Sequence, residues 1–233
     1  NCLLIEDACH AFGAEYRFNK KLIKVGSCKH ADISTFSLHP LKPITTGEGG
    51  LITTNNRMLA KKIKNFRSHG IIRNSKSHWQ YDILYPGYNY RLSDINSALG
   101  ITQLKKIKIF LRYRKEVYER YKMELNNYKN IITFPSYNIK NRPSYHLVLM
   151  NINFKGLKLN KDLFLRYLYR NNILCQFHYI PIYKFTLYKE KTLNLNDSEE
   201  YYKSTLSIPI YHSLDRKKQN KVIKIIKLFF KNS

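Results

Sequence analysis

One lysine, Lys42, lies in a glycine-rich stretch whose composition could support amine chemistry. The stretch is Ser37–Gly50, with the sequence SLHPLKPITTGEGG. A strand is predicted before it and another after it, and loops at strand ends are where α/β enzymes place reactive groups. Glycines there permit a tight turn and a close approach of the backbone to a ligand. A lone lysine in a loop is more often a solvated charge, so the interpretation depends on the residues that accompany it.

Three further residues match the needs of a pyridoxal-phosphate (PLP) site. PLP chemistry uses a lysine amine for the resting Schiff base, a carboxylate that keeps the pyridine nitrogen protonated, and donors for the phosphate. Asp7 ends a predicted buried strand, where a carboxylate is costly unless it is paired, and a pyridinium would pair it. Ser37 could offer a hydroxyl to the phosphate, and His10 could reach the same side of the ring.

Strands alternate with helices over residues 1–105, which favours an α/β layer architecture. The predicted strands are short runs, the first of them buried: Cys2–Glu6, Asp32–Leu38 and Gly50–Thr54. The predicted helices have apolar residues at helical spacing: Arg57–Ser68, and Asp94–Ile107 with Ser93 as its N-cap. Between Asp7 and Lys42, the basic stretch Arg17–Lys24 lengthens a turn and predicts a surface hairpin.

The second half of the chain has a different pattern. A long amphipathic helix is predicted over residues 108–127, as a bridge between domains. After Pro135 short strands and helices mix, which predicts a second, smaller α+β domain. The strands are expected at Tyr145–Asn151 and Ile173–Tyr179, and the helices at Asn160–Asn171, Tyr201–Leu206 and Lys217–Lys231.

The charge is strongly basic, with 41 Lys and Arg against 16 Asp and Glu, or a net +25 over 233 residues. Such a field can attract nucleic acid. The lysines are spread along the chain, however, and accompany heavy use of Ile, Asn and Tyr, which is typical of an AT-rich coding bias. No nucleic-acid partner is therefore expected, and the charge would suit an anionic small-molecule substrate.

The cysteines and the apolar runs indicate in which cellular compartment the protein is expected. Cys2, Cys9, Cys28 and Cys175 form no CxxC pair and have no metal-ligand spacing, so no metal is expected and a reduced, cytoplasmic location fits best. No signal peptide is visible and no apolar run approaches the roughly 20 residues of a membrane helix. Because an apolar run follows Asn1 directly, we expect sequence to be missing upstream.

Several motifs occur together in one order along the chain. They are Ile5–Gly13 (IEDACHAFG), Ser34–Gly50, Gly87–Asp94 (GYNYRLSD), His178–Pro181 (HYIP) and Leu206–Tyr211 (LSIPIY). Each is weak alone, but together they resemble the DegT/DnrJ family of PLP-dependent nucleotide-sugar aminotransferases over nearly the whole chain.

The resemblance implies a type I PLP-dependent transferase fold. Residues 1–107 would be the C-terminal part of the large PLP-binding domain with its mixed sheet, and residues 108–233 the linking helix and the small C-terminal domain. It also implies a homodimer whose active sites are shared between subunits. A chain without the preceding part of the large domain would lack some of the cofactor's phosphate and ring contacts.

The same resemblance assigns roles residue by residue. Lys42 would be the catalytic Schiff-base lysine and Asp7 the partner of the pyridine nitrogen. His10 would contact the phenolic oxygen of the ring and Ser37 the phosphate. Asn89, in the GYNYR motif, would reach the phosphate of the partner subunit's cofactor.

The likeness is greatest to the aminotransferases of pseudaminic acid biosynthesis, through Gly26–Asp32 and His39–Thr46. It implies transfer of an amino group from glutamate to the 4-keto carbon of a UDP-linked 6-deoxy-N-acetyl sugar. The product would be UDP-4-amino-4,6-dideoxy-N-acetyl-β-L-altrosamine. In the second domain His178 is a candidate substrate-side residue, although a histidine at a strand end beside a proline turn accounts for it equally well.

Most of the candidate residues could also have a purely architectural role. Asp7 could cap a helix, His10 could be a packed or solvent-facing side chain, Ser37 a plain strand residue and Asn89 a turn residue. The protein could be another nucleotide-sugar aminotransferase of the family, or an inactive fragment or remnant of one. A dehydratase of the family would carry His in place of the lysine, and Lys42 argues against it.

Overall fold

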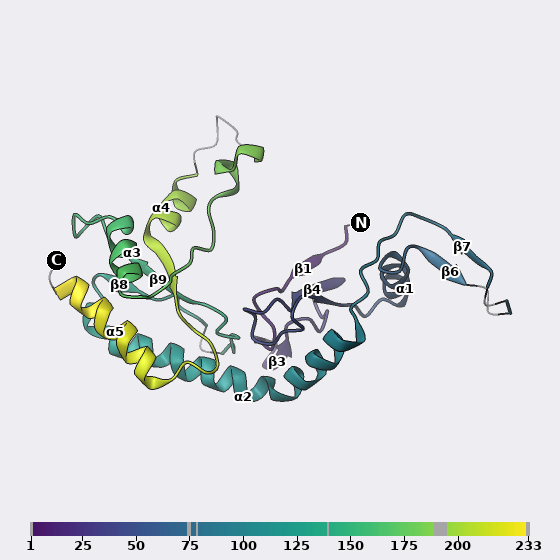
Figure 1. Ribbon diagram of the computed structural model, residues 1–233, viewed down its shortest axis with the longest axis horizontal. Helices are drawn as coiled ribbons and strands as arrows, with labels where there is room; N and C mark the ends of the chain where they lie inside the picture. Colours follow the sequence, from purple (N-terminus) through teal and green to yellow (C-terminus); the bar gives the residue numbers. More distant parts are fainter. Residues whose placement is uncertain (1, 74–75, 78, 139, 189–194, 232–233) are drawn as a thin grey trace. The chain divides into compact units, whose positions relative to one another are not determined.

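The computed structural model describes residues 2–73, 76–77, 79–138, 140–188 and 195–231. They fall into two compact units (Figure 1). Unit 1 comprises residues 1–109 and 138–144, and unit 2 residues 110–137 and 145–233. Within the described parts of the chain, none of the helices combines the length and apolar character needed to cross a membrane.

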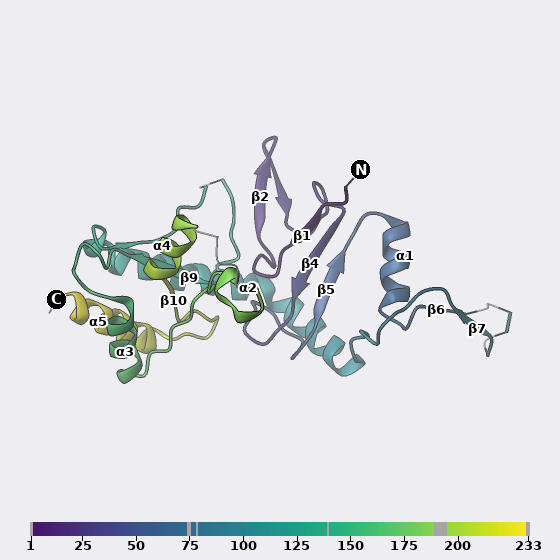
Figure 2. The ribbon, with the colours of Figure 1, turned by 90° about the horizontal axis from the view of Figure 1, so that it is seen from above.

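Unit 1 is built on a mixed three-stranded sheet in the order β1-β4-β5. β1 (Ile5–Asp7) runs parallel to β4 (Ile33–Ser37), which pairs antiparallel with β5 (Gly50–Thr53). The three arrows lie side by side in Figure 2. The predicted strands are confirmed, and Asp7 pairs with Thr35 in the register of β1 and β4.

The prediction that the first strand is buried is wrong for this chain. Leu3, Leu4 and Ile5 are 58–61% exposed, and Asp7 is exposed as well. The reason is that β1 pairs only with β4 among the described strands, so its other edge is open. An exposed carboxylate needs no counter-charge to be stable, so the position of Asp7 on the strand does not by itself indicate a bound cation. Evidence for a role of Asp7 in a cofactor site must therefore come from the residues around it.

A hairpin connects the two site-bearing strands of unit 1. Its strands are β2 (Glu15–Phe18) and β3 (Lys21–Lys24), which pair antiparallel. Asn19 and Lys20 at its tip have φ of 45° and 65°, the left-handed values that a tight two-residue hairpin turn requires. The surface hairpin predicted for residues 17–24 is therefore confirmed.

The helix predicted after β5 is also confirmed. It is α1 (Arg57–Phe66), and the side chain of Asn56 caps it by accepting hydrogen bonds from the N–H groups of Met58 and Leu59. A second hairpin follows, formed by β6 (Ile71–Arg73) and β7 (Tyr81–Ile83). The sequence pattern did not predict it. Figure 1 shows these two strands projecting beyond α1.

One continuous helix, α2 (Asp94–Glu124), replaces the two helical segments predicted over residues 94–127. Its 31 residues begin at the predicted cap, since the Ser93 Oγ accepts a hydrogen bond of 3.2 Å from the Asn96 N–H. Residues up to 109 belong to unit 1 and the rest to unit 2, where Tyr118 and Tyr121 are fully buried.

Unit 2 is an antiparallel sheet with helices. The sheet has the order β10-β9-β8, with strands at Thr205–Ile208, Val148–Ile152 and Ile132–Thr133 respectively. Its helices are α3 (Lys161–Arg170), α4 (Asn196–Ser204) and α5 (Arg216–Lys231). Short 3₁₀ turns lie at Asn126–Tyr128, Ile182–Lys184 and Thr186–Tyr188. The core consists of buried side chains from these elements and from α2, and the fully buried ones include Tyr121, Met150, Phe164, Leu206 and Ile226.

Two predictions in this half are wrong. Residues 173–179 do not form a strand, because only Gln176 pairs, exchanging two backbone hydrogen bonds with Ser207. The helix predicted at residues 201–206 ends at Ser204, and Thr205 begins a buried strand. All four side chains of β10 are buried, so tertiary packing outweighs the local helical pattern there.

Candidate functional site

The loop that carries Lys42 is tied together at both ends. The Leu38 N–H donates to the Gly49 carbonyl at 2.9 Å, and the Thr46 N–H donates to the Leu38 carbonyl at 3.0 Å. Inside the loop, the Lys42 N–H donates to the His39 carbonyl at 2.9 Å and closes a turn. The backbone around Lys42 is thus held in one conformation before any ligand arrives.

Small residues allow α2 to pack closely against this loop. A Cβ on Gly100 would lie 2.7 Å from the Thr46 Cγ2, so the helix and the loop approach closely only because the helix has glycine there. Gly49 has a φ of 152°, and a Cβ on it would lie 2.5 Å from the Thr46 Oγ1. These glycines position the loop, as the sequence pattern indicated.

The Lys42 amine is half-buried, and its surroundings make it a better nucleophile. Burial lowers the pKa of Lys42, while the nearby Cys9 and Asp7 side chains act in the opposite direction. Asp7 ends β1, and the Lys42 loop follows β4, the parallel neighbour of β1, so both residues lie at the same edge of the sheet. A lowered pKa leaves more of the amine neutral, which is the form that attacks a carbonyl.

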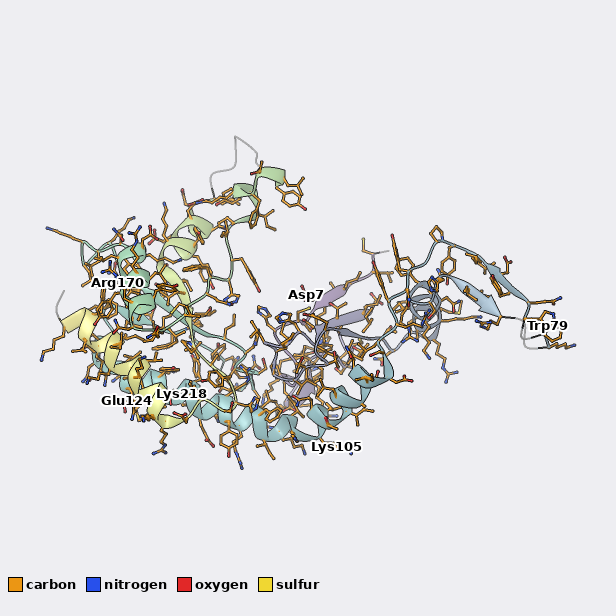
Figure 3. The ribbon with its side chains drawn as sticks, in the orientation of Figure 1. Asp7, Trp79, Lys105, Glu124, Arg170 and Lys218 are labelled. Atoms are coloured by element: carbon orange, nitrogen blue, oxygen red, sulfur yellow. The ribbon has the colours of Figure 1, made fainter. Side chains whose placement is uncertain are left out.

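Asp7 presents an ionised carboxylate at the carboxyl end of β1, where Figure 3 labels it. Its Oδ1 accepts a hydrogen bond of 3.0 Å from the Cys9 N–H. Hydrogen bonds from the side chain and backbone of Cys9 lower the pKa of Asp7, and the charges of His10 and Lys42 lower it further. Such a carboxylate can hold a protonated ring nitrogen through a charge-assisted hydrogen bond.

His10 and Ser37 lie close to this pair in the fold. His10 is near enough to Asp7 to lower its pKa, and its carbonyl accepts a 2.7 Å hydrogen bond from the Ser144 Oγ. Ser37 is the last residue of β4, half-buried, and its Oγ accepts a 3.4 Å hydrogen bond from the His39 N–H. Because β1 and β4 are parallel, Asp7 and Ser37 emerge at the same edge of the sheet.

The segment of Asn89 is attached to the end of α1. The Tyr88 N–H donates to the Phe66 carbonyl at 2.8 Å, and Asn89 bridges Ser68 in an antiparallel pair. Asn89 itself is exposed, and no hydrogen bond between described residues joins it to Lys42 or Asp7. The structure of one chain therefore does not bring Asn89 into the site.

Two glycines fix the path of that segment. A Cβ on Gly70 would lie 2.1 Å from the Tyr85 carbonyl oxygen, and a Cβ on Gly87 would lie 2.3 Å from the Gly70 nitrogen. Here two stretches of backbone cross with no room for any side chain. The direction in which the chain enters and leaves the β6–β7 hairpin is set at this crossing.

His178 belongs to unit 2, where its Nδ1 lies 2.7 Å from the Ser207 Oγ. The histidine is half-buried and held by β10. This contact orients the imidazole ring of His178. That His178 contacts a substrate stays a prediction.

Cys9 is a residue of this site that the sequence motifs did not single out. The sequence shows it only as one of four cysteines without a pairing pattern, yet its N–H donates the 3.0 Å hydrogen bond to the Asp7 Oδ1. The signal that could have indicated it is its position on the turn two residues after Asp7.

The chain is related to known proteins over almost all of its length. The profile described as the DegT/DnrJ/EryC1/StrS aminotransferase family matches residues 1–227. The chain belongs to this aminotransferase family. The resemblance inferred from the motifs is therefore confirmed.

Two curated members of the family are similar to this chain in sequence. The UDP-4-amino-4,6-dideoxy-N-acetyl-beta-L-altrosamine transaminase of Campylobacter jejuni (strain 81-176) is 41% identical over 221 residues, which are 93% of this chain and 56% of that protein. The Helicobacter pylori transaminase of the same name is 37% identical over 231 residues, covering 97% of this chain and 58% of that protein. The chain thus spans less than two thirds of the length of these relatives.

Solved structures of aminotransferases share the fold. PseC of Helicobacter pylori, an aminotransferase involved in the biosynthesis of pseudoaminic acid, superimposes with a TM-score of 0.89 at 33% identity, over 99% of this chain and 60% of that one. Spr1654 of Streptococcus pneumoniae in its PLP-form has a TM-score of 0.83 at 24% identity, over 97% and 57%. The predicted α/β fold of the PLP-dependent sugar aminotransferases is confirmed.

Proposed function

We propose that the protein is a PLP-dependent aminotransferase that transfers the amino group of glutamate to a UDP-linked 4-keto-6-deoxy-N-acetyl sugar. One observation carries the proposal. The Asp7 carboxylate ends β1, and the loop of Lys42 leaves the parallel neighbour β4, so two separate segments of the chain bring these groups to the same edge of the sheet. The two altrosamine transaminases and PseC, with 33–41% identity, support the choice of substrate.

The residues present fit the cofactor. PLP, when bound, supplies an aldehyde and an electron-accepting ring. The ionised Asp7 suits the protonated pyridine nitrogen, and Ser37, at the same edge of the sheet, suits the phosphate. His10 lies beside Asp7 and is assigned to the phenolic oxygen.

Lys42 then has two tasks. Its amine attaches the cofactor between turnovers, and once released it moves a proton at the carbon that gains or loses the amino group. Both tasks need an amine that is neutral part of the time, and burial lowers the pKa of Lys42 in that direction. The hydrogen bonds of the loop backbone restrict the positions that the amine can take, which would help to orient it toward the cofactor.

The proposal includes a homodimer in the cytoplasm, with each active site shared between subunits. Asn89 would complete the partner's phosphate site, as the resemblance of the GYNYR motif to the family implies. The β6–β7 hairpin that precedes it exposes Trp79, Tyr81 and Ile83 by 55–67%. A two-stranded hairpin with exposed apolar residues is marginally stable alone. Packing against a second copy of the chain would bury these residues and stabilise the hairpin.

The dimer predicts a concentration-dependent association. In sedimentation velocity, the double variant Tyr81→Ser/Ile83→Ser is expected to dissociate at about tenfold higher concentration or more than the unchanged protein, because it loses buried apolar area. Phe18→Ser on the β2–β3 hairpin, also exposed (43%), is the matched control and should have no effect. A monomeric unchanged protein at tens of micromolar, or an equal effect of the control, would contradict the dimer.

The cofactor assignment is tested by chemical trapping. The protein is incubated with millimolar PLP, reduced with borohydride and digested, so that even a weak site is recorded. The pyridoxyl group is expected on Lys42 in preference to exposed lysines such as Lys29, because Lys42 has the lowered pKa and the adjacent Asp7. Labelling spread evenly over the lysines would overturn the assignment.

A further inference from the structure

The chain passes briefly from unit 2 into unit 1 and then returns to unit 2. Residues 138–144 belong to unit 1, whereas residues 110–137 before them and residues 145–233 after them belong to unit 2. We call residues 140–144 the return segment. Its hydrogen bonds reach residues 10–17, which follow Asp7 closely in the sequence. A distant part of the chain thus contacts the region of the proposed cofactor site.

The return segment is fastened to the start of β2. Glu15 and Arg142 exchange two backbone hydrogen bonds of 2.8 and 2.7 Å, and their side chains form an ion pair of 3.0 Å. The Asn141 Oδ1 accepts a further hydrogen bond of 2.9 Å from the Arg17 N–H. These contacts hold the segment against the β2–β3 hairpin and bring Ser144 to the turn that precedes the hairpin.

Ser144 contacts that turn through a buried hydroxyl. The residue is 4% exposed, and its Oγ donates a hydrogen bond of 2.7 Å to the His10 carbonyl. The same peptide group is held on its other side, because the Ala11 N–H donates to the Ala8 carbonyl at 2.9 Å and closes a turn around Cys9 and His10. Both polar groups of the His10–Ala11 peptide are therefore hydrogen-bonded, one within the turn and one to Ser144.

The hydroxyl of Ser144 contributes more than packing. Alanine would occupy nearly the same space, but the His10 carbonyl would lose its donor. The orientation of the His10–Ala11 peptide would then depend on the turn alone. Because the direction of a side chain depends on the backbone that carries it, the His10 side chain would be held less firmly.

We propose that Ser144 is a positioning residue of the cofactor site, whose buried hydroxyl fixes the His10–Ala11 peptide and so holds His10, three residues after Asp7, in place. The inference rests on the proposed function only for what His10 then contacts, because the hydrogen bond is made by the chain's own residues. Ser144 lies 134 residues after His10 in the sequence, so the site depends on the middle of the chain as well as on its first half.

The first test measures amide hydrogen exchange of the full chain without cofactor. Ser144→Ala is expected to speed exchange at the Ala11 N–H by about fivefold, because the turn opens more easily once its last peptide has lost a hydrogen bond. The Leu38 N–H, which donates to the Gly49 carbonyl in the same unit, should exchange as before. Ser27→Ala is the control, since Ser27 is an exposed serine of unit 1, and it should change neither rate.

The second test adds PLP and follows the absorbance band of lysine-bound cofactor. Ser144→Ala is expected to need about fivefold more PLP for half-saturation, the equivalent of one hydrogen bond. In a His10→Ala background the same substitution should have at most a small further effect, because the hydroxyl acts through His10. A contribution of Ser144 to the fold alone would weaken PLP binding equally in both backgrounds.

Three results would overturn the inference. They are unchanged exchange at Ala11 in Ser144→Ala, equally faster exchange at Leu38, and equal weakening of PLP binding with and without the His10 side chain. Failure of the unchanged protein to bind PLP, with faster exchange at Ala11 in Ser144→Ala, would instead refute the proposed function and support the Ser144–His10 contact.

Discussion

Turnover is expected to fall by about 10³-fold or more when Lys42 is replaced by alanine. The amine both attaches the cofactor and moves the proton, so no other group of the loop can substitute for it. The measurement is amino transfer from glutamate to a UDP-linked 4-keto sugar, followed as 2-oxoglutarate formed. The spectral band of lysine-bound PLP should disappear in the same variant, because the covalent attachment is lost.

Lys29→Ala is the matched control for this substitution. Lys29 is an exposed lysine of the same unit, on the segment after the β2–β3 hairpin, and its removal subtracts the same charge from the protein. Activity and spectrum should be unchanged in it. Amino transfer that survives in Lys42→Ala would show that the lysine assignment is wrong.

The second large effect is expected from Asp7→Asn. An amide cannot keep the pyridine nitrogen protonated, so the ring would accept electrons poorly and kcat should fall by about 100-fold, or about 2.7 kcal/mol of transition-state stabilisation. The pKa of Asp7 is lowered by Cys9, His10 and Lys42, so the carboxylate stays ionised down to an unusually acidic pH. The loss of activity as the pH falls is therefore expected to come from protonation of the Lys42 amine, whose pKa burial lowers, and not from Asp7.

Glu6→Gln is the control here. Glu6 is the adjacent residue of β1, but its carboxylate accepts a hydrogen bond of 2.6 Å from the Ser34 hydroxyl of β4. The side chains of consecutive strand residues point to opposite faces, which accounts for the difference. Loss of turnover in Glu6→Gln equal to that in Asp7→Asn would mean that the sheet is disturbed and not the cofactor site.

Much of the site could be predicted because it depends on local pattern. The loop around Lys42 was recognisable from its glycines, and the strands that flank it from their short β-branched and aromatic runs. Since β1 and β4 are parallel neighbours, Asp7 and Ser37 had to emerge at one edge of the sheet once both strands were placed. The neighbouring positions of Asp7 and Lys42 follow from topology more than from any single motif.

The remaining features depend on contacts that sequence spacing does not encode. Whether Cys2–Ile5 is buried is decided by what packs against the strand, and the described chain offers only β4. Gln176 has the apolar neighbours of a strand residue, yet a single bridge to Ser207 is all that forms. The contact of Cys9 with Asp7 could not be predicted, because it is made by the backbone N–H of Cys9 and depends on the turn that follows β1.

The crossing of Gly70 and Gly87 has a consequence for how this protein can change over evolutionary time. Because two stretches of main chain touch there, the direction of the hairpin depends on glycine at these two positions. It does not depend on which side chains the other hairpin residues carry. Surface residues of the hairpin are then free to diversify, and to follow changes in whatever they touch, without redirecting Asn89. We therefore expect the two glycines to vary less among homologous sequences than the other residues of the hairpin segment.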